Sequence, residues 1–164
     1  MTHNKPKILF LSRLYLPHIG GVEKHIEKIS EKLSKKYNIS LITHKYDPRL
    51  KDFEIIKGVS VYRLPNVEKF AVWRWLFFHL SLLKSADIIH IHDVFYWYLP
   101  FRLLFPFKKV FMTFHGYEGA DAPNWKQIFW HRLAALLTQG NICIGGFHQK
   151  YYGVKPTFVS YGAV

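Results

Sequence analysis

The sequence predicts an α/β fold in which helices cover both faces of a doubly wound parallel sheet of six or seven strands. Short apolar runs alternate along the chain with longer, helix-like segments, and this alternation is typical of strand–helix–strand units. The short runs are apolar at successive positions rather than only at every second one. Parallel strands that are buried on both faces have this pattern.

The first strand and the helix after it are the clearest elements. Lys7–Ser12 (KILFLS) is apolar through its middle, and Val22–Lys36 places its apolar residues at helical spacing in a single stripe. Glutamates lie early in this helix and two lysines lie at its end, where the helix dipole favours them. Ile39–Thr43 is the next expected strand.

The rest of the chain continues the alternation. Helices are expected at Phe70–Lys84, which is apolar nearly all round, and at Trp125–Thr138. The further strands are expected at Val59–Leu64, Asp87–His92, Val110–Phe114, Asn141–Ile144 and Thr157–Ser160. No internal repeat or linker divides the chain, so residues 1–164 are expected to form one domain.

The composition excludes several protein classes. Apolar residues make up 49% of the chain and charged residues 21%, which argues against disorder. The single cysteine, Cys143, excludes an internal disulfide and suits a reducing compartment. The longest apolar stretches, Phe70–Leu83 and Val94–Phe107, are shorter than the roughly 18 residues that span a bilayer. Surface-bound or buried segments are therefore expected there.

The net charge of +12 is spread along the chain without a block of five like charges, unlike the basic tails that bind nucleic acid. A diffuse positive field attracts anions. Nucleic acid, acidic lipid and phosphorylated small molecules all fit this field. The sequence carries no signature of a nucleic-acid-binding fold, so no nucleic-acid partner is expected.

Aromatic residues make up 18% of the chain and gather in two runs, residues 70–78 and 95–107. Lysines and arginines flank both runs, and aromatic and cationic residues together can seat a segment at an anionic membrane interface. Core packing explains most of these rings. The alternative is partial exposure to lipid, to a hydrophobic acceptor or to another domain.

Gly20 and Gly21 lie directly before the clearest helix. A helix start presents unpaired N–H groups and a positive partial charge, and glycine lets a ligand approach the backbone closely. These features favour a phosphate or diphosphate site. The alternative is that the two glycines only permit the turn and close packing. The sequence contains neither the dinucleotide-binding fingerprint nor a P-loop.

Histidines end or follow three of the expected strands, at His44, His92 and His115, where ligands bind in a doubly wound sheet. His115, beside Gly116, is placed to bind a substrate hydroxyl or to act as an acid or base, unless it only caps the strand. His90, His92 and Asp93 end another strand. No matched third ligand accompanies them, so a polar contact from His92 or Asp93 is expected in place of a metal site.

Taken in order, these motifs resemble the N-terminal domain of a retaining GT-B glycosyltransferase of family 4. The resemblance rests on residues 7–43, on ADIIHIHD and VFMTFHGYE, and on the ending FVSYGAV, and it covers nearly the whole chain. The ending departs from the family's usual IPNGVD segment. The implied fold is one Rossmann-like domain of the two that form a GT-B enzyme.

The resemblance implies transfer of a sugar from a nucleotide-diphosphate donor to an acceptor hydroxyl, with retention at the anomeric carbon and without a cofactor or metal. His115 would be the catalytic residue, and N–H groups around Gly20 and Gly21 would bind the donor phosphates. The family's usual front-face scheme requires no protein nucleophile. The residues that would bind the acceptor are Tyr15, His18, His92, Asp93 and Gly116.

The family's second domain, which holds the nucleotide, is absent from these 164 residues. Residues 1–164 are therefore expected to be the acceptor-side half of a truncated or split hexosyltransferase that is inactive alone. Its expected partners are nucleotide sugar, acceptor, and either the C-terminal domain or a second subunit that is a separate polypeptide. The basic and aromatic content fits a cytoplasmic location, peripheral to the membrane, and a lipid-linked or membrane-proximal acceptor. The alternative is a non-catalytic Rossmann-like module that docks on an anionic membrane or a partner protein.

Overall fold

The computed structural model describes residues 5–116 and 122–161, which fold around one sheet. Its strands are β1 (Lys7–Ser12), β2 (Asn38–His44), β3 (Phe53–Ile56), β4 (Val59–Leu64), β5 (Ile88–His92), β6 (Lys109–Phe114), β7 (Gly140–Ile144) and β8 (Phe158–Ser160). They lie in the order β3-β4-β2-β1-β5-β6-β7-β8. All neighbours are parallel except β3 and β4. The predicted fold class is confirmed.

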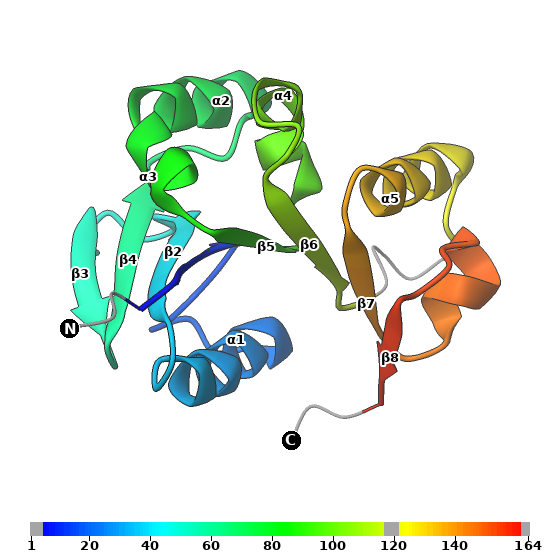
Figure 1. Cartoon of the computed structure of the whole chain (residues 1–164), viewed down its shortest axis with the longest axis horizontal. Helices are drawn as coiled ribbons and strands as arrows, with labels where there is room; N and C mark the ends of the chain where they lie inside the picture. The colour runs from blue at the N-terminus through cyan, green and yellow to red at the C-terminus, as the bar shows by residue number, and fades with distance from the viewer. Residues whose placement is uncertain (1–4, 117–121, 162–164) are drawn as a thin grey trace.

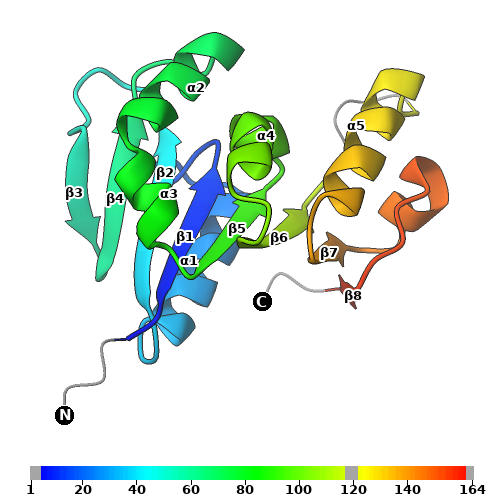
Figure 2. The ribbon, with the colours of Figure 1, turned by 45° about the horizontal axis from the view of Figure 1, so that its top comes forward.

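Helices lie on both faces of this sheet (Figure 1). They are α1 (Gly21–Leu33), α2 (Lys69–Phe78), α3 (Leu80–Ser85), α4 (Phe95–Leu104), α5 (Trp125–Leu136) and the short π-helix η1 (His148–Tyr152). Figures 1 and 2 show α1 on one face and α2, α3, α4 and α5 over the other. The direction of strand succession reverses between β1 and β5, and this reversal defines the switch point of a doubly wound sheet.

The apolar strands divide their side chains between two cores. Ile8 and Phe10 of β1 pack with Ile26 on the α1 face, whereas Leu9 and Leu11 pack in the larger core under the other helices. This division follows from the alternation of side chains along a strand. It also explains why β1 reads as a continuous apolar run, since both of its faces are covered.

The expectation of six or seven strands was wrong by one edge strand. Phe53–Ile56 pairs antiparallel with β4, and its side chains are alternately exposed and half-buried. A two-residue turn, Lys57-Gly58, joins the two strands, and both residues have positive φ angles, 49° and 80°. An X-Gly pair between two β-like runs is a recognised hairpin signal, so the sequence did contain the information.

Two helical expectations also need correction. The helix expected over Phe70–Lys84 is interrupted at His79, which separates α2 from α3. The stretch Val94–Phe107 was described only as apolar, and no helix was expected there. Helix α4 contains Pro100, and proline removes an N–H donor from a helix. The acceptor that would lose its partner is the carbonyl of Tyr96, four residues earlier. It accepts a hydrogen bond from Trp73 Nε1 at 2.8 Å, so α2 compensates the defect in α4.

The aromatic runs divide between core and surface, so core packing holds for part of them and the rest are exposed. Rings of α4, such as Trp97 and Tyr98, are fully buried. Rings of α2 and of the segment after α4 face solvent: Phe70 is 79% exposed, Phe78 77% and Phe107 96%. Helices α2 and α4 are in contact, so the exposed residues lie on neighbouring elements.

We expect Arg63→Ala to be strongly destabilising. The Arg63 side chain is fully buried in β4 and donates to the carbonyls of Leu16 (2.8 Å) and Lys51 (3.1 Å) and to the carboxylate of Glu54. The Glu54 carboxylate is 30% exposed, so water partly replaces the lost ion pair, and the lost hydrogen bond to a charged group costs about 1.5–3 kcal/mol. Urea unfolding measures the change. The control is Arg49→Ala, whose side chain is 90% exposed and should give no measurable change; an equal effect of both would contradict the prediction.

Candidate active site

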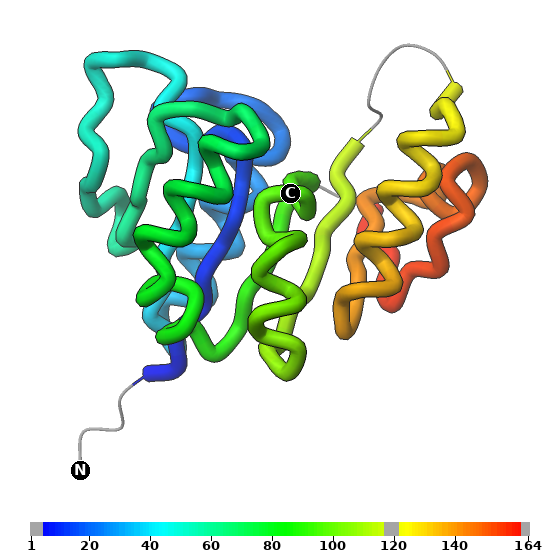
Figure 3. The backbone as a smooth tube through the Cα atoms, turned by 90° about the horizontal axis from the view of Figure 1, so that it is seen from above, coloured from blue at the N-terminus to red at the C-terminus, as the bar shows by residue number. Residues whose placement is uncertain are grey.

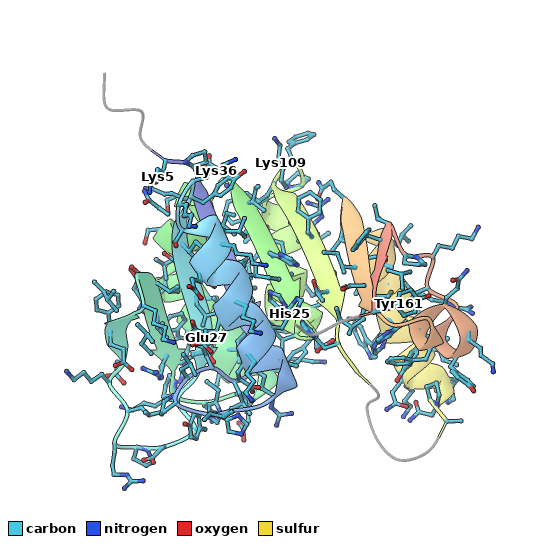
Figure 4. The ribbon with its side chains drawn as sticks, turned by 90° about the horizontal axis from the view of Figure 1, so that it is seen from below. Lys5, His25, Glu27, Lys36, Lys109 and Tyr161 are labelled. Carbon is cyan, nitrogen blue, oxygen red and sulfur yellow. The ribbon has the colours of Figure 1, made fainter. Side chains whose placement is uncertain are left out.

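A pocket of about 540 Å³ opens at the switch point, at the carboxyl ends of β1, β5 and β6. This is where a doubly wound sheet binds its ligands, and the pocket lies beside the strand ends that the sequence singled out. Figure 4 shows His25 at this edge, while Lys5, Lys36 and Lys109 lie at the opposite edge of the sheet. The pocket is lined by Ser12, Arg13, Leu14, Gly21, Val22, Glu23, His25, His92, Asp93, Val94, Tyr96, His115, Gly116 and Ile144.

The two glycines at the start of α1 have different surroundings. A Cβ atom on Gly21 would meet nothing within 4 Å, and Gly21 lines the pocket. A Cβ on Gly20, the N-cap residue, would collide with the carboxylate of Glu23. Glu23 is buried and contacts His18, with 3.1 Å between Oε1 and Nδ1. Of these two glycines, Gly21 is therefore the one with open space for a ligand in the pocket.

The charges at this end of α1 come from Glu23 and Arg13. The Glu23 carboxylate lies at the positive end of the helix dipole, where an anion is stabilised, and so takes part of the space near the helix N-terminus. Arg13, directly after β1, is exposed and lines the same pocket. A guanidinium can bind two phosphate oxygens at once. A diphosphate would thus meet Gly21 and Arg13 rather than the Gly20 side.

His115 is held at the pocket by two contacts. Its Nε2 lies 2.8 Å from Nδ1 of His92, so one of the two rings donates to the other. Its backbone N–H donates to Oδ1 of Asp93 at 2.9 Å. Asp93 itself has a φ of 61°, a left-handed conformation that aspartate tolerates better than most residues. These contacts leave Nδ1 of His115 as the ring nitrogen that can meet a substrate.

Two further histidines pack against this pair. The rings of His25 and His115 meet edge to face with centroids 4.9 Å apart. His90 stacks on His92 at 4.6 Å, and its Nε2 lies 2.8 Å from Oγ1 of Thr113. His92 is buried, and its Nε2 has no hydrogen-bond partner among the described residues. Four imidazoles from α1, β5 and the end of β6 thus form one cluster.

Burial keeps this cluster uncharged near neutral pH. Burial, followed by the charges of neighbouring histidines, lowers the pKa of His115 to about 3 and that of His90 to about 4. The same causes hold the pKa of His92 well below its usual value. His115 would therefore act at pH 7 as a neutral hydrogen-bonding group. Within residues 5–116 and 122–161, no group of three or more histidine, cysteine or acidic side chains is arranged to hold a metal ion.

Acidification from pH 7 to pH 5 should destabilise the domain. The folded pKa of His115 lies below the unfolded value of about 6.5, so the unfolded chain binds more protons. Stability is therefore complete above pH 6.5 and falls as the pH decreases toward the folded pKa, by up to about 1.4 kcal/mol per pH unit for each such histidine. Urea unfolding at both pH values measures the loss. His115→Asn should reduce it, and a pH-independent midpoint would contradict the assignment.

Of the five residues expected to bind the acceptor, the structure places three in the pocket lining and two outside it. His92, Asp93 and Gly116 line the pocket. Tyr15 does not: it is 1% exposed and packs in the core beneath α1, where burial raises its pKa to about 12. His18 contacts Glu23 and the ring of Tyr46 outside the pocket lining. The parts of the expected motifs at residues 117–118 and 162–164 lie outside the described residues.

Arg13, Glu23, His25 and Tyr96 line the pocket without having been predicted as site residues. A signal was available for His25, because it lies three residues after Val22 and one before Ile26, on the stripe that faces the sheet. Arg13 directly follows a strand, which is the position that the fold assigns to ligands. Tyr96 lies four residues after the expected strand Asp87–His92, so it carried the same strand-end signal as Arg13.

Comparison with known proteins assigns the family. The sequence profile described as Glycosyltransferase Family 4 matches residues 19–153. The chain belongs to glycosyltransferase family 4. This domain is 29% identical over 130 residues to an uncharacterized glycosyltransferase of Methanocaldococcus jannaschii, a match that covers 68% of this chain and 33% of that protein.

Two further comparisons place this family 4 domain among larger proteins. It is 32% identical over 103 residues to one subunit of the human phosphatidylinositol N-acetylglucosaminyltransferase, a match that covers 57% of this chain and 21% of that relative. Its fold is similar to sucrose-phosphate synthase from Thermosynechococcus elongatus, with a TM-score of 0.70, 13% identity, and coverage of 94% and 47% of the two chains. The domain spans a third or less of the curated relatives it matches.

Proposed function

We propose that this family 4 domain is the acceptor-binding half of a retaining glycosyltransferase that uses a nucleotide-diphosphate sugar. The observation that carries the proposal is the pocket at the switch point, where Gly21, Arg13 and His115 converge. The first two fit the phosphates of a donor, and His115 fits a sugar or an acceptor hydroxyl. The nucleotide would be bound by the C-terminal half of the enzyme.

Arg13 and the backbone N–H groups at the start of α1 would stabilise the departing diphosphate. Negative charge grows on the diphosphate as the glycosidic bond breaks, and donors that are fixed in advance stabilise that charge. The backbone N–H groups at a helix start are such donors, and no side chain at Gly21 obstructs them. The charge of Arg13 adds to the same field.

His115 would position the reacting groups through hydrogen bonds. Because burial lowers its pKa to about 3, the ring is neutral and can accept or donate without a fixed charge. The contacts with His92 and Asp93 fix its orientation, which reduces the entropy lost when the acceptor is aligned. Transfer through an oxocarbenium-like transition state needs such alignment and no protein nucleophile.

The decisive experiment is to assay this chain with and without the polypeptide encoded directly downstream. We expect transfer from a radiolabelled nucleotide sugar to a membrane extract only when both halves are present. Transfer by this chain alone would contradict the assignment of a half-enzyme. No transfer under either condition, with binding to anionic vesicles retained, would favour the alternative of a non-catalytic docking module.

A membrane-proximal, cytoplasmic-face location is part of the proposal. The relative named for phosphatidylinositol suggests a lipid acceptor, and α2 carries both exposed aromatic rings and the exposed basic residue Arg74. No helix among the described residues is long and apolar enough to cross a bilayer. Contact with the membrane would therefore be made by the surface of this domain.

Replacing Phe70, Phe78 and Phe107 with serine should weaken binding to anionic vesicles while leaving the fold intact, because all three side chains are more than three-quarters exposed. Each phenylalanine that inserts contributes at least about 1.5 kcal/mol, or roughly tenfold in affinity. Vesicle sedimentation measures the loss. Ile55→Ser, at an exposed site on the edge strand β3 (68%), is the control, and an equal loss there would argue against a defined membrane face.

A further inference from the structure

A second pocket, of about 410 Å³, lies between α4 and α5 on the face opposite α1. Figure 3 shows β6 running between these two helices, and residues of β6 form the pocket floor. The volume falls within the roughly 300–1,000 Å³ of small-molecule sites. Nothing in the donor chemistry described above uses this pocket.

The inner part of the second pocket is mainly apolar. Its buried lining comes from α4, β6 and α5: Phe95, Met112, Phe114 and Ala134 are apolar, and His131, whose Nδ1 lies 2.9 Å from the carbonyl oxygen of Gln127, is the polar member. The rings of Tyr96 and Trp130 complete the walls. Transfer of a hydrocarbon chain from water to such a surface is favourable.

The mouth of the second pocket is cationic. Lys69 and Lys126 line it, and Nζ of Lys69 lies 5.5 Å from the centre of the Trp130 ring. Asp93 is the single carboxylate among the lining residues that the structure describes, and its Oδ1 already accepts from the His115 N–H. An apolar interior with a cationic mouth is complementary to an anionic amphiphile.

The second pocket adjoins the candidate active site. Asp93 and Tyr96 line both pockets. Tyr96 is fixed there because its carbonyl accepts from Trp73 of α2, and Asp93 also holds the backbone of His115. A ligand in the second pocket would therefore place its polar end beside the histidine cluster.

We propose that the second pocket binds the hydrocarbon chain of an amphiphilic phosphate, with the phosphate beside Lys69 and Lys126, and that this amphiphile is the sugar acceptor. The last clause rests on the proposed transferase function. The ligand class is thus a phospholipid that inserts one chain and carries a free hydroxyl on its headgroup; decyl phosphate reproduces its chain and its phosphate. The acceptor hydroxyl would then reach the first pocket past Asp93 and Tyr96.

The test is calorimetric titration of the 164-residue chain with decyl phosphate, at concentrations below micelle formation. We expect one site. Inorganic phosphate should give no measurable heat, and decyltrimethylammonium, which has the same chain and the opposite charge, should bind at least tenfold more weakly. Equal binding of the cationic and anionic amphiphiles would overturn the proposal, because the lysines would then play no part.

Two tryptophans of α5 provide a matched pair of variants. Trp130 lines the pocket and packs with Lys69, whereas Trp125 lies outside it and packs with Lys126. Trp130→Ala should weaken decyl phosphate binding at least tenfold, and Trp125→Ala should leave it unchanged. Equal losses would indicate general adhesion to exposed rings and would overturn the pocket.

A surface variant guards against a folding defect. Lys69→Gln combined with Lys126→Gln changes only exposed side chains and should also lower the affinity at least fivefold, with an unchanged thermal transition. If Trp130→Ala weakened binding to anionic vesicles but not to monomeric decyl phosphate, the site would be a membrane surface and the pocket proposal would fail.

These outcomes are separable from the transferase function. The titration needs neither nucleotide sugar nor the C-terminal half. Absence of binding, with transfer intact in the two-half assay, would overturn this inference and leave the proposed function standing. Binding without any transfer would retain the amphiphile site and remove the claim that its ligand is an acceptor.

Discussion

Gly21→Val should abolish sugar transfer by the assembled two-half enzyme and leave the fold of this domain unchanged. A Cβ atom at this position meets nothing within 4 Å, so the branched side chain projects into the pocket. There it occupies the space through which a diphosphate must approach the helix N-terminus. We expect the rate to fall by at least 10³-fold, because a phosphate that cannot reach the N–H donors loses several kcal/mol of transition-state stabilisation.

The measurement is initial rate together with a urea unfolding curve of the isolated chain. Gly21→Ala is the graded control, since a single methyl group should reduce the rate less than the valine side chain. Gly20→Ala is a second comparison, because its Cβ displaces the Glu23 carboxylate instead of filling the pocket. Normal turnover by Gly21→Val would remove the phosphate assignment.

His115→Ala should lower the transfer rate by about 10²- to 10⁴-fold, the range typical of a positioned hydrogen-bonding or acid–base side chain. The substitution removes the ring nitrogen that faces the substrate and also the partner of His92 Nδ1. The backbone contact from the His115 N–H to Asp93 survives, so the loop geometry should persist. Steady-state kinetics with the melting temperature as a second readout measure the effect.

The control for His115→Ala is His90→Asn. His90 belongs to the same histidine cluster but contacts Thr113 and does not line the pocket, so it should change the rate little. If His115→Ala left the rate unchanged, His115 would be only a residue that ends its strand. If His90→Asn lowered the rate as much, the cluster would act by packing rather than by contact with substrate.

The sequence predicted the parallel strands well, because their signal is local. Burial on both faces makes the middle of Lys7–Ser12 apolar at every position, Val59–Leu64 is rich in β-branched and aromatic residues, and the structure reproduces the bounds of both strands. Helix α4 was not predicted. Proline is disfavoured inside a helix because the carbonyl four residues earlier, here that of Tyr96, loses its N–H donor. The partner of that carbonyl is Trp73, 27 positions before Pro100, and a local pattern does not contain such a contact.

The sequence predicted where the site lies but not which residues line it. Strand ends located His92, Asp93 and His115, because topology alone brings the carboxyl ends of parallel strands together. Tyr15 also follows a strand closely, yet its ring points into the core. Whether a residue just after a strand turns inward or toward the pocket depends on the loop path, which composition and spacing do not specify.

The bond from Trp73 to the carbonyl of Tyr96 makes positions 73 and 100 an energetically coupled pair. An alanine at 100 would restore an N–H that competes for the same carbonyl, so the indole donor would matter less in that background. The effects of substitutions at the two positions on the free energy of unfolding should therefore be non-additive. Replacement of the proline at position 100 should make tryptophan at position 73 less necessary. A proline that breaks the rule for one helix thereby links that helix to its neighbour.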